Sequence, residues 1–357
     1  MQQKRKKLCI FAPQKKRIEM KKEDLRIVFM GTPEFAVETL RMLVENGYNV
    51  VAVVTQPDKP VGRHQNELQP SAVKQYALEQ GLPVLQPEKM KDPEFVETLR
   101  GYRANLQVVV AFRMLPEVVW AMPEYGTFNV HAALLPQYRG AAPINWAVIN
   151  GETETGVTTF FLDHDIDTGR IIMKKHFPIP DDADVEYVYD GLMHLGADIC
   201  RETIEAIMAA DGHPETVEQD TLGADPQCAQ GTQMGQAPCV LKPAPKIFKE
   251  TCEINWQTTA KRVYDFVRGL SPYPGAWTTL VNPEGKKTVL KIFKTRKTGE
   301  ASAEPFAITV DDKKLFVACA DEKLEILELQ MEGKKRMLAA DFLNGMREKL
   351  KTEIIFR

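Results

Sequence analysis

The chain has 357 residues, of which 44% are hydrophobic and 27% charged, and its formal net charge is −3. A single hydrophobic core seldom grows beyond about 250 to 300 residues, so two domains are expected. No apolar run reaches the roughly 18 residues that a membrane-spanning helix needs. We therefore expect a cytoplasmic protein that has no membrane contact. The cysteines form no Cys-x-x-Cys pair, which argues against a zinc site and against a disulfide framework.

Residues 1 to 19 are rich in Lys and Arg, and their apolar patch at 8 to 12 is too short for a secretory signal. A second start, Met20-Lys21-Lys22, comes directly before the first predicted strand. We expect residues 1 to 23 to form a disordered N-terminal extension without a function of its own.

The first 180 residues alternate apolar runs with amphipathic stretches, which is typical of a parallel sheet covered by helices. The predicted strands are Leu25–Met30, Val50–Thr55, Leu106–Phe112 and Thr127–His131. This pattern predicts an α/β domain over residues 24 to 210.

Helix signals lie between these strands. Thr32 is expected to cap a helix in which Pro33 takes the first position and which ends near Asn46. Two further helices are predicted, one after Ser71 and one over residues 184 to 209.

Residues 211 to 235 are polar, rich in Gly, Pro and Gln, and lack periodicity, which predicts a linker. A second domain is expected over residues 236 to 357. It begins with a helix and continues with short strands, which indicates a small barrel or sandwich. The helix is predicted at 258–269, and the strands at 276–281, 288–294, 315–320 and 324–331.

Charge is unevenly divided along the chain. Residues 20 to 235 are net negative, whereas the N-terminal extension and residues 236 to 357 are net positive. Such asymmetry suggests that the C-terminal part meets a polyanion, although a solvated basic face would give the same pattern.

An Asn-Val-His sequence ends the predicted strand Thr127–His131. Because strand side chains alternate, Asn129 and His131 point to the same face. Such a pair can hold one small polar atom, and polar residues at strand ends also serve only to satisfy loops. The two residues alone leave both interpretations open.

Several common sites find no support in the sequence. The turn at residues 30 to 35 has one glycine where a dinucleotide fingerprint needs three, and no P-loop sequence occurs. Asp163, Asp165 and Asp167 alternate like the start of a calcium loop, but Thr168 takes the place of the turn glycine. No His-Glu-x-x-His frame is present. We therefore expect no metal.

Three elements in order resemble the folate-dependent formyltransferases: Asn129-Val130-His131, Leu134-Leu135-Pro136 and Asp167-Thr168-Gly169. Within that superfamily, nearly all of residues 24 to 350 is similar to the methionyl-tRNA formyltransferase family. The resemblance implies a Rossmann-like formyltransferase domain with a mostly parallel sheet, followed by a small OB-like β-barrel domain. The sequences that carry it further are those at 26–36, 55–60, 139–144, 244–247 and 267–274.

The same resemblance implies a reaction. The donor would be N10-formyltetrahydrofolate and the acceptor the free α-amine of methionine on initiator tRNA, in a protein expected to be a monomer. Asn129 and His131 would hold the tetrahedral oxyanion. Asp167 would keep His131 charged and correctly turned, and would receive or relay the amine proton.

The folate slot is expected at the carboxyl end of the third strand, the usual ligand side of an open α/β sheet. Its predicted residues are Ala111, Phe112, Arg113, Met114, Leu115, Leu134, Leu135 and Pro136.

For the tRNA, Arg63 in the loop at residues 56 to 70 would enter the acceptor end, where the first base pair is the expected checkpoint. The second domain would bind phosphates, which position the RNA without reading its sequence. The residues expected there are Lys291, Lys294, Arg296, Lys297, Lys334, Lys335 and Arg336.

Two positions depart from the family pattern. Ala133 stands where the family usually has Ser, and residues 64 to 68 lack the Lys that relatives often carry. Two alternatives stay open: a formyltransferase that acts on an amino sugar nucleotide, and a non-catalytic RNA-binding protein on a formyltransferase core.

Overall fold

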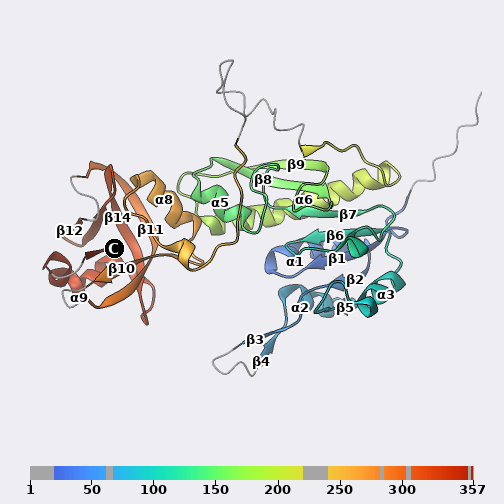
Figure 1. Ribbon diagram of the computed structural model, residues 1–357, viewed down its shortest axis with the longest axis horizontal. Helices are drawn as coiled ribbons and strands as arrows, with labels where there is room; N and C mark the ends of the chain where they lie inside the picture. Colours follow the sequence, from blue (N-terminus) through green and yellow to red (C-terminus); the bar gives the residue numbers. More distant parts are fainter. Residues whose placement is uncertain are drawn as a thin grey trace, which may run out of the picture.

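The computed structural model, shown in Figure 1, has two domains side by side along its long axis. It describes residues 20–61, 67–219, 240–281, 285–302, 307–352 and 355–356. Within these ranges no helix is both long and apolar enough to cross a membrane.

The first domain is built on a seven-stranded sheet in which five strands are parallel and the last two are antiparallel. The predicted mostly parallel sheet is therefore confirmed. In sheet order the strands are β5 (Val84–Leu85), β2 (Asn49–Val54), β1 (Arg26–Gly31), β6 (Leu106–Val110), β7 (Thr127–His131), β8 (Glu154–Phe161) and β9 (Ile171–Pro178).

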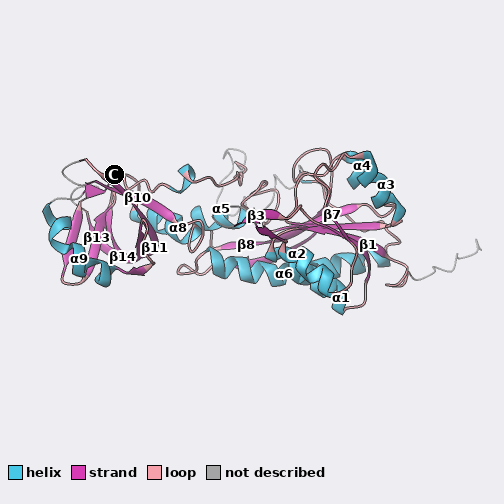
Figure 2. Cartoon of the chain, turned by 90° about the horizontal axis from the view of Figure 1, so that it is seen from below, coloured by secondary structure: helices cyan, strands magenta, loops and turns pink. Residues whose placement is uncertain are grey.

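Helices cover both faces of this sheet (Figure 2). On one face lie α1 (Glu34–Glu45), α2 (Ala72–Glu79) and α6 (Val185–Ala209), and on the other lie α3 (Pro93–Gly101) and α4 (Glu117–Trp120). A short helix, α5 (Pro143–Ile149), stands at the end of the domain that faces the second one. A hairpin, β3 (Lys59–Val61) with β4 (Glu67–Gln69), projects from the domain.

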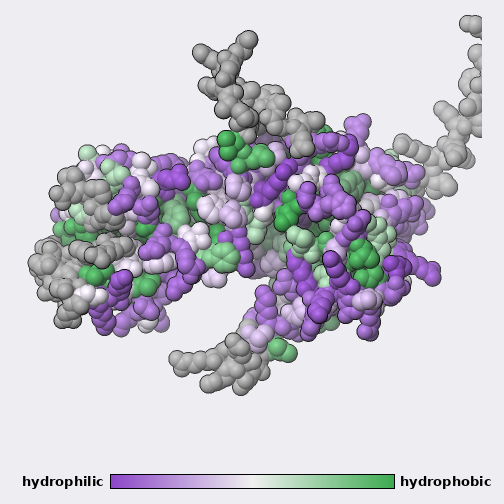
Figure 3. Space-filling view, viewed as in Figure 1, coloured by the Kyte–Doolittle hydropathy of each residue, from purple (hydrophilic) through white to green (hydrophobic). Residues whose placement is uncertain are grey.

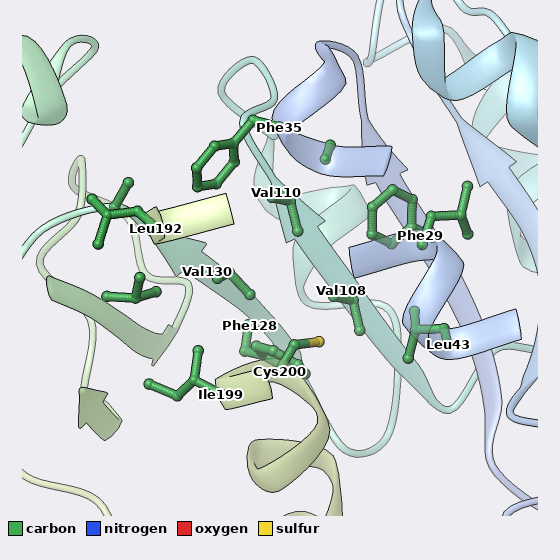
Figure 4. Close-up of a cluster of buried hydrophobic side chains, with 14 of the residues drawn as sticks. Phe29, Phe35, Leu43, Val108, Val110, Phe128, Val130, Leu192, Ile199 and Cys200 are labelled. Carbon is green, nitrogen blue, oxygen red and sulfur yellow. The ribbon is translucent and has the colours of Figure 1, made fainter. Parts of the chain in front are cut away.

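Alternate residues of the central strands face two separate cores. Phe128 and Val130 of β7 join the core under α1 and α6, and Val109 of β6 joins the core under α3 and α4. Asn129 and His131 alternate with Phe128 and Val130, so they lie on the α3–α4 face. The core under α1 and α6 also contains Phe29, Phe35, Leu43, Val108, Val110, Leu192, Ile199 and Cys200 (Figure 4).

The prediction that Thr32 caps α1 was wrong. The helix begins at Glu34, and Pro33 is its N-cap residue with extended backbone (φ −76°, ψ 171°). Thr32 is thus one residue too early for its hydroxyl to reach the first free backbone N–H groups. Its Oγ1 is buried without a hydrogen-bond partner in the part of the chain that the structure describes. Ser71, by contrast, accepts a bond from the Lys74 backbone N–H and caps α2.

The second domain is an antiparallel sheet with two covering helices, α8 (Ala260–Gly269) and α9 (Ala339–Thr352), after a 3₁₀ turn at Glu250–Cys252. Trp256 is fully buried in its core. Among the described residues no ladder joins the first and last strands, so closure into an OB-like barrel stays a prediction. The sheet order is β12 (Ile308–Asp311), β13 (Lys314–Ala318), β14 (Glu322–Met331), β11 (Lys287–Ala301), β10 (Ala276–Val281) and β16 (Ile355–Phe356), with β15 (Met337–Leu338) on β14.

Specific contacts join the two domains. The Asn145 side-chain amide donates to the Gly269 carbonyl at 2.9 Å, and the buried Arg268 Nη1 donates to the Ala183 carbonyl at 2.8 Å. Lys297 of β11 pairs with Asp181 of the first domain at 2.6 Å. The first domain is therefore held in a defined position against α8 and β11.

The domain boundaries at 24–210, 211–235 and 236–357 stay predictions, but part of the expected linker is bound to the first domain. Val217 pairs with Ile171 through two backbone hydrogen bonds of 2.8 Å. The chain therefore follows the edge of β9 beyond residue 210.

Candidate active site

His131 stands at the carboxyl end of β7 and is only 6% exposed. Its Nε2 lies 2.9 Å from the carbonyl oxygen of Tyr138. A carbonyl oxygen can only accept, so Nε2 is the protonated nitrogen and donates this bond. Nδ1 faces the Asp167 Oδ2 atom at 3.8 Å. Nδ1 is therefore the ring nitrogen that remains for a substrate.

Asn129 lies two residues earlier on the same strand and on the same face. It is half-buried, beside Val109 of β6 and Phe160 of β8 in the sheet register. Its side-chain amide makes no hydrogen bond to any residue that the structure describes. The NH₂ group is thus available to a ligand at the end of the sheet.

Asp167 comes to the same place on a tight turn. Its Oδ2 accepts a hydrogen bond of 2.9 Å from the Gly140 backbone N–H, and its own backbone is left-handed (φ +55°). Gly169 makes the turn possible, because a Cβ there would overlap the carbonyl oxygen of Phe161. The turn therefore places the Asp167 carboxylate next to His131.

The loop at residues 138 to 142, here called the catalytic loop, pairs with the segment that leads into the second domain. Ala244 donates its N–H to the Arg139 carbonyl at 2.9 Å and accepts from the Ala142 N–H at 3.2 Å. Gly140 has φ +129°, and a Cβ there would collide with the Ala244 carbonyl. The Tyr138 N–H donates to the Lys242 carbonyl at 2.7 Å. The backbone that holds His131 and Asp167 is thus fixed partly from the second domain's side.

Tyr138 anchors this loop through its side chain. The buried phenol donates to Glu152, whose Oε1 also accepts from Lys242 Nζ at 2.5 Å. Burial, and then the bond to Glu152, raises the pKa of Tyr138, so the phenol stays neutral. Its role is to hold the backbone carbonyl that meets His131.

The segment after β6 forms a wall beside the site. Ala111 is exposed and left-handed (φ +47°). Arg113 donates through Nη1 to the Glu88 carbonyl at 2.9 Å and through Nη2 to the Pro87 carbonyl. Its guanidinium lies 5.7 Å from the ring centre of Phe112. These contacts tie the wall to the loop before α3.

A hollow of about 540 Å³ opens against this wall. Met114 and Leu115 line it, whereas the other six residues predicted for the folate slot do not. Trp120 and His164 were not predicted to line the site, and their rings meet edge to face with centres 5.3 Å apart. The rest of the lining is Lys89, Met90, Lys91, Pro116 and Glu117. The described residues contain no group of three or more candidate metal ligands.

Two family models match the chain: "Formyl transferase" over residues 25–204 and "Formyl transferase, C-terminal domain" over residues 246–347. The methionyl-tRNA formyltransferase of Parabacteroides distasonis is 58% identical over 331 residues, which is 92% of this chain and 98% of that protein. The chain belongs to the methionyl-tRNA formyltransferase family. The match of nearly the whole relative includes both domains described above.

Solved structures with lower identity share the fold. HypX from Aquifex aeolicus in complex with tetrahydrofolic acid has a TM-score of 0.57 and 18% identity, over 92% of this chain and 47% of that one, so this chain spans about half the length of HypX. The sugar 3N-formyl transferase WlaRD has a TM-score of 0.55 and 17% identity, over 87% of this chain and 99% of that one. At this identity the likeness is one of fold.

The Leu-Leu-Pro loop of the family is held from β8. Thr158 Oγ1 donates to the Ala133 carbonyl at 2.7 Å and accepts from the Leu135 N–H at 3.1 Å. Ala133, where the family usually has Ser, is fully buried, and so is Leu135, which packs with Phe160 and Ile171. Leu135 therefore supports the site from the core and offers no surface to a ligand.

Four of the eight basic residues predicted to bind tRNA already have partners in the protein. Lys291 Nζ donates to the Pro274 carbonyl at 2.8 Å, and Lys297 pairs with Asp181 as described above. Arg296 pairs with Glu325, and Arg336 with Glu328 at 2.5 Å. These four cations stabilise the second domain or its contact with the first.

Lys294, Lys334 and Lys335 differ from these four. They are exposed, and their side chains make no hydrogen bond or ion pair with any described residue. Arg63 lies outside the described residues, between the two strands of the β3–β4 hairpin. The three lysines are thus the predicted contacts that are best placed to meet phosphates.

Proposed function

We propose that this chain transfers the formyl group of N10-formyltetrahydrofolate to the α-amine of methionine on initiator tRNA, in the cytoplasm and as a monomer. The observation that carries the proposal is the pairing of buried His131 with half-buried Asp167, on the strand face that also carries Asn129, in a chain that aligns with nearly the whole length of its relatives. A C–N bond forms between the methionine nitrogen and the formyl carbon, the bond from that carbon to N10 breaks, and one proton passes from the amine to N10.

Asn129 and His131 supply the hydrogen bonds for the oxyanion that develops on the formyl oxygen. The Asn129 NH₂ donates directly. Because His131 Nε2 already donates to Tyr138, Nδ1 can donate only when the ring carries a second proton. The Asp167 Oδ2 atom lies 3.8 Å from Nδ1, so a second proton on the ring would stand beside a carboxylate oxygen. Removal of one such donor costs about 10²- to 10³-fold in rate.

Asp167 handles the amine proton. Its Oδ2 faces His131, and the bond from the Gly140 N–H fixes its direction. A carboxylate held in this way can take a proton from the amine as the C–N bond forms, either directly or through one water. No covalent bond to the protein is needed.

The folate would lie in the hollow described above, against the wall that Ala111–Leu115 form. A flat ring system fits such a place, because the apolar side chains of Met90, Met114 and Leu115 line it. Lys89 and Lys91 on the rim of the hollow carry the charge that complements the carboxylates of the folate tail.

The second domain favours an RNA acceptor over an amino sugar. Lys294, Lys334 and Lys335 offer exposed positive charge on a domain that a small sugar nucleotide would not need. Figure 3 shows an open notch between that domain and the β3–β4 strands, and hydrophilic residues border much of it. An acceptor stem that enters this notch would contact both domains.

The test is formyl transfer by the purified chain from N10-formyltetrahydrofolate to methionyl-initiator tRNA, with dTDP-linked amino sugars as competing acceptors. We expect formylmethionyl-tRNA as the product and no reaction with the sugars. Transfer to the sugars alone would contradict the proposed acceptor. If no amine were formylated, the interpretation as a non-catalytic RNA-binding protein would stand.

Two substitutions then separate chemistry from binding. Asn129→Ala and His131→Ala should each lower kcat by about 10²- to 10³-fold, while the Kd for tRNA stays within about threefold of wild type. Equal losses of turnover and of tRNA affinity would place these residues in a binding surface.

A further inference from the structure

Gln219 joins two parts of the active site that are far apart in the sequence. Its side chain is 4% exposed and makes four hydrogen bonds. Nε2 donates to the carbonyl oxygens of Asp167 at 2.9 Å and Gly169 at 2.8 Å. Oε1 accepts from Arg139 Nη2 at 2.6 Å and Nε at 3.1 Å. Both protons and both lone pairs of the amide are therefore used.

The backbone around Gln219 is fixed independently of these bonds. Val217, two residues earlier, pairs with Ile171 at the start of β9 through two backbone bonds of 2.8 Å. Arg170 donates to Thr216 Oγ1 and to Glu218, each at 2.7 Å. Gln219 thus reaches the site from a segment that is anchored to the sheet edge.

The turn that Gln219 holds has an unfavourable backbone. Asp167 is left-handed (φ +55°), a conformation that is uncommon in residues other than glycine, although aspartate adopts it more readily than most. The Asp167 carboxylate receives one bond, from Gly140 of the catalytic loop, while its carbonyl receives another, from Gln219. Arg139, the residue before Gly140, binds the other end of the same Gln219 amide. The amide therefore fixes the turn and the loop relative to each other.

We propose that Gln219 is a positioning residue for Asp167, and that Arg139 serves it as an anchor. The amide of Gln219 sets the distance between the Asp167 carboxylate and His131 without a contact to substrate. This inference rests on the proposed formyl transfer and adds a residue to its machinery. Misplacement of a catalytic group by about 1 Å can cost on the order of 10²-fold in rate.

Gln219→Glu is the most selective variant. A carboxylate keeps the acceptor for Arg139 but has no proton to donate to the two carbonyl oxygens of the turn. Gln219→Leu removes both functions at similar volume. The matched control is Gln107→Leu, since Gln107 is a fully buried glutamine of β6 whose Oε1 accepts from Thr127 Oγ1, away from the site.

With methionyl-initiator tRNA and N10-formyltetrahydrofolate, we expect Gln219→Glu and Gln219→Leu to lower kcat by about 10- to 100-fold. The KM for each substrate should stay within about threefold of wild type, and Gln107→Leu should leave kcat within about twofold. Wild-type kcat in Gln219→Glu would overturn the proposal, as would equal losses in Gln219→Leu and Gln107→Leu.

A double variant identifies the residue through which Gln219 acts. In an Asp167→Asn background, Gln219→Leu should lower the residual rate by less than about twofold, because a side chain that acts only through Asp167 has nothing left to position. The same fold-loss in both backgrounds would show an effect independent of Asp167 and would overturn the proposal. A wild-type protein that formylated only another amine would contradict the proposed acceptor alone, and the same variants would then be compared with that amine.

Discussion

Gly140 occupies the point where the catalytic loop crosses the segment that leads to the second domain. Its φ of +129° is open to glycine, and a Cβ would meet the Ala244 carbonyl. Gly47 also has a positive φ (+72°), but a Cβ added there would meet no atom within 4 Å. A substitution at Gly47 therefore reports the cost of the backbone conformation alone, whereas one at Gly140 also includes the cost of the steric clash with Ala244.

Gly47→Ala should lower the free energy of unfolding by about 1 to 2 kcal/mol, which is typical of alanine at a left-handed position. Gly140→Ala should lower it by clearly more. Activity should fall only in Gly140→Ala, because relief of the clash with Ala244 would shift the backbone N–H that binds the Asp167 carboxylate. Urea unfolding and kcat measure the two effects. Equal stability losses with full activity in both variants would show that the crossing at Ala244 is not constrained.

Thr158 and Thr155 provide a matched pair on β8. The Thr158 hydroxyl bridges the Ala133 carbonyl and the Leu135 N–H, whereas the Thr155 hydroxyl is buried without a partner among the described residues. Thr158→Val should cost about 1 to 3 kcal/mol, because it leaves a buried donor and a buried acceptor unpaired. Thr155→Val should be neutral or stabilising in the same denaturation experiment. The reverse order would contradict the bridging role of Thr158.

Among the elements, β11 shows why a basic sequence does not by itself define an RNA contact. Lys294 and Lys297 are three residues apart, but only Lys297 has a partner among the described residues, the Asp181 carboxylate of the first domain. The hydrogen bond from Lys297 holds the pKa of Asp181 below its usual value. The stabilisation is therefore present above the ordinary Asp value and is lost as the pH falls through the lowered one.

This difference predicts separable effects of two lysine substitutions. Lys294→Ala should weaken tRNA binding and reduce the slope of log Kd against log salt by about one, as expected when one phosphate contact is lost. Lys297→Ala should leave that slope unchanged and should lower stability by less than about 1 kcal/mol, since the pair with Asp181 is largely exposed. Filter binding at several salt concentrations gives the slopes. A larger slope change in Lys297→Ala would mean that this lysine leaves Asp181 to bind RNA.

The elements that the sequence predicted well are those whose pattern is local. The strand Thr127–His131 has the predicted bounds, and the last predicted strand of the second domain, β14 (Glu322–Met331), differs by two residues at its start. The antiparallel strands β8 and β9 and the hairpin β3–β4 were not predicted, because β8 and β9 carry many polar residues and the hairpin strands have three residues each. Their pairing depends on neighbours that periodicity does not reveal.

The candidate site also combines residues that the sequence predicts with one that it does not. The residues Asn129, His131 and Asp167 could be named from the strand end and the family resemblance, and His131 and Asp167 do lie together in the structure. Gln219 could not be found, because it lies 52 residues after Asp167 in a segment whose composition is that of a linker. Leu135 was expected at the folate slot and is instead in the core. Along residues 133 to 136 buried and half-buried residues alternate, and Leu135 is one of the buried ones.

At the scale of the whole molecule, both domains keep thiols out of water. Cys200 lies in the core under α1 and α6, and Cys319 in the core of the second domain. Burial raises the pKa of Cys200 above the ordinary thiol range, and burial, with the nearby Asp321, raises the pKa of Cys319 to about 12. Folding thus keeps both groups neutral at pH values where an unfolded thiol ionises.

We expect Cys200 and Cys319 to resist iodoacetamide at pH 8 in the native protein and to react in urea, as peptide mass mapping would show. Because their pKa values are raised in the folded state, their contribution to stability is complete below the unfolded value of 9.0 and declines as the pH rises above it. Rapid alkylation of either cysteine in the native state would show that its core opens.

The proposed transfer reaction requires the Asp167 carboxylate to handle the amine proton. Asp167 and Asp165 are alternate aspartates of the same turn, but only Asp167 faces His131, while Asp165 is exposed. The most direct measurement is the single-turnover rate of formyl transfer to methionyl-initiator tRNA in Asp167→Asn and Asp165→Asn. We predict a loss of about 10²- to 10⁴-fold in Asp167→Asn, with tRNA affinity unchanged, and less than about a twofold loss in Asp165→Asn. A wild-type rate in Asp167→Asn would contradict the role of the His131–Asp167 pair in the chemistry.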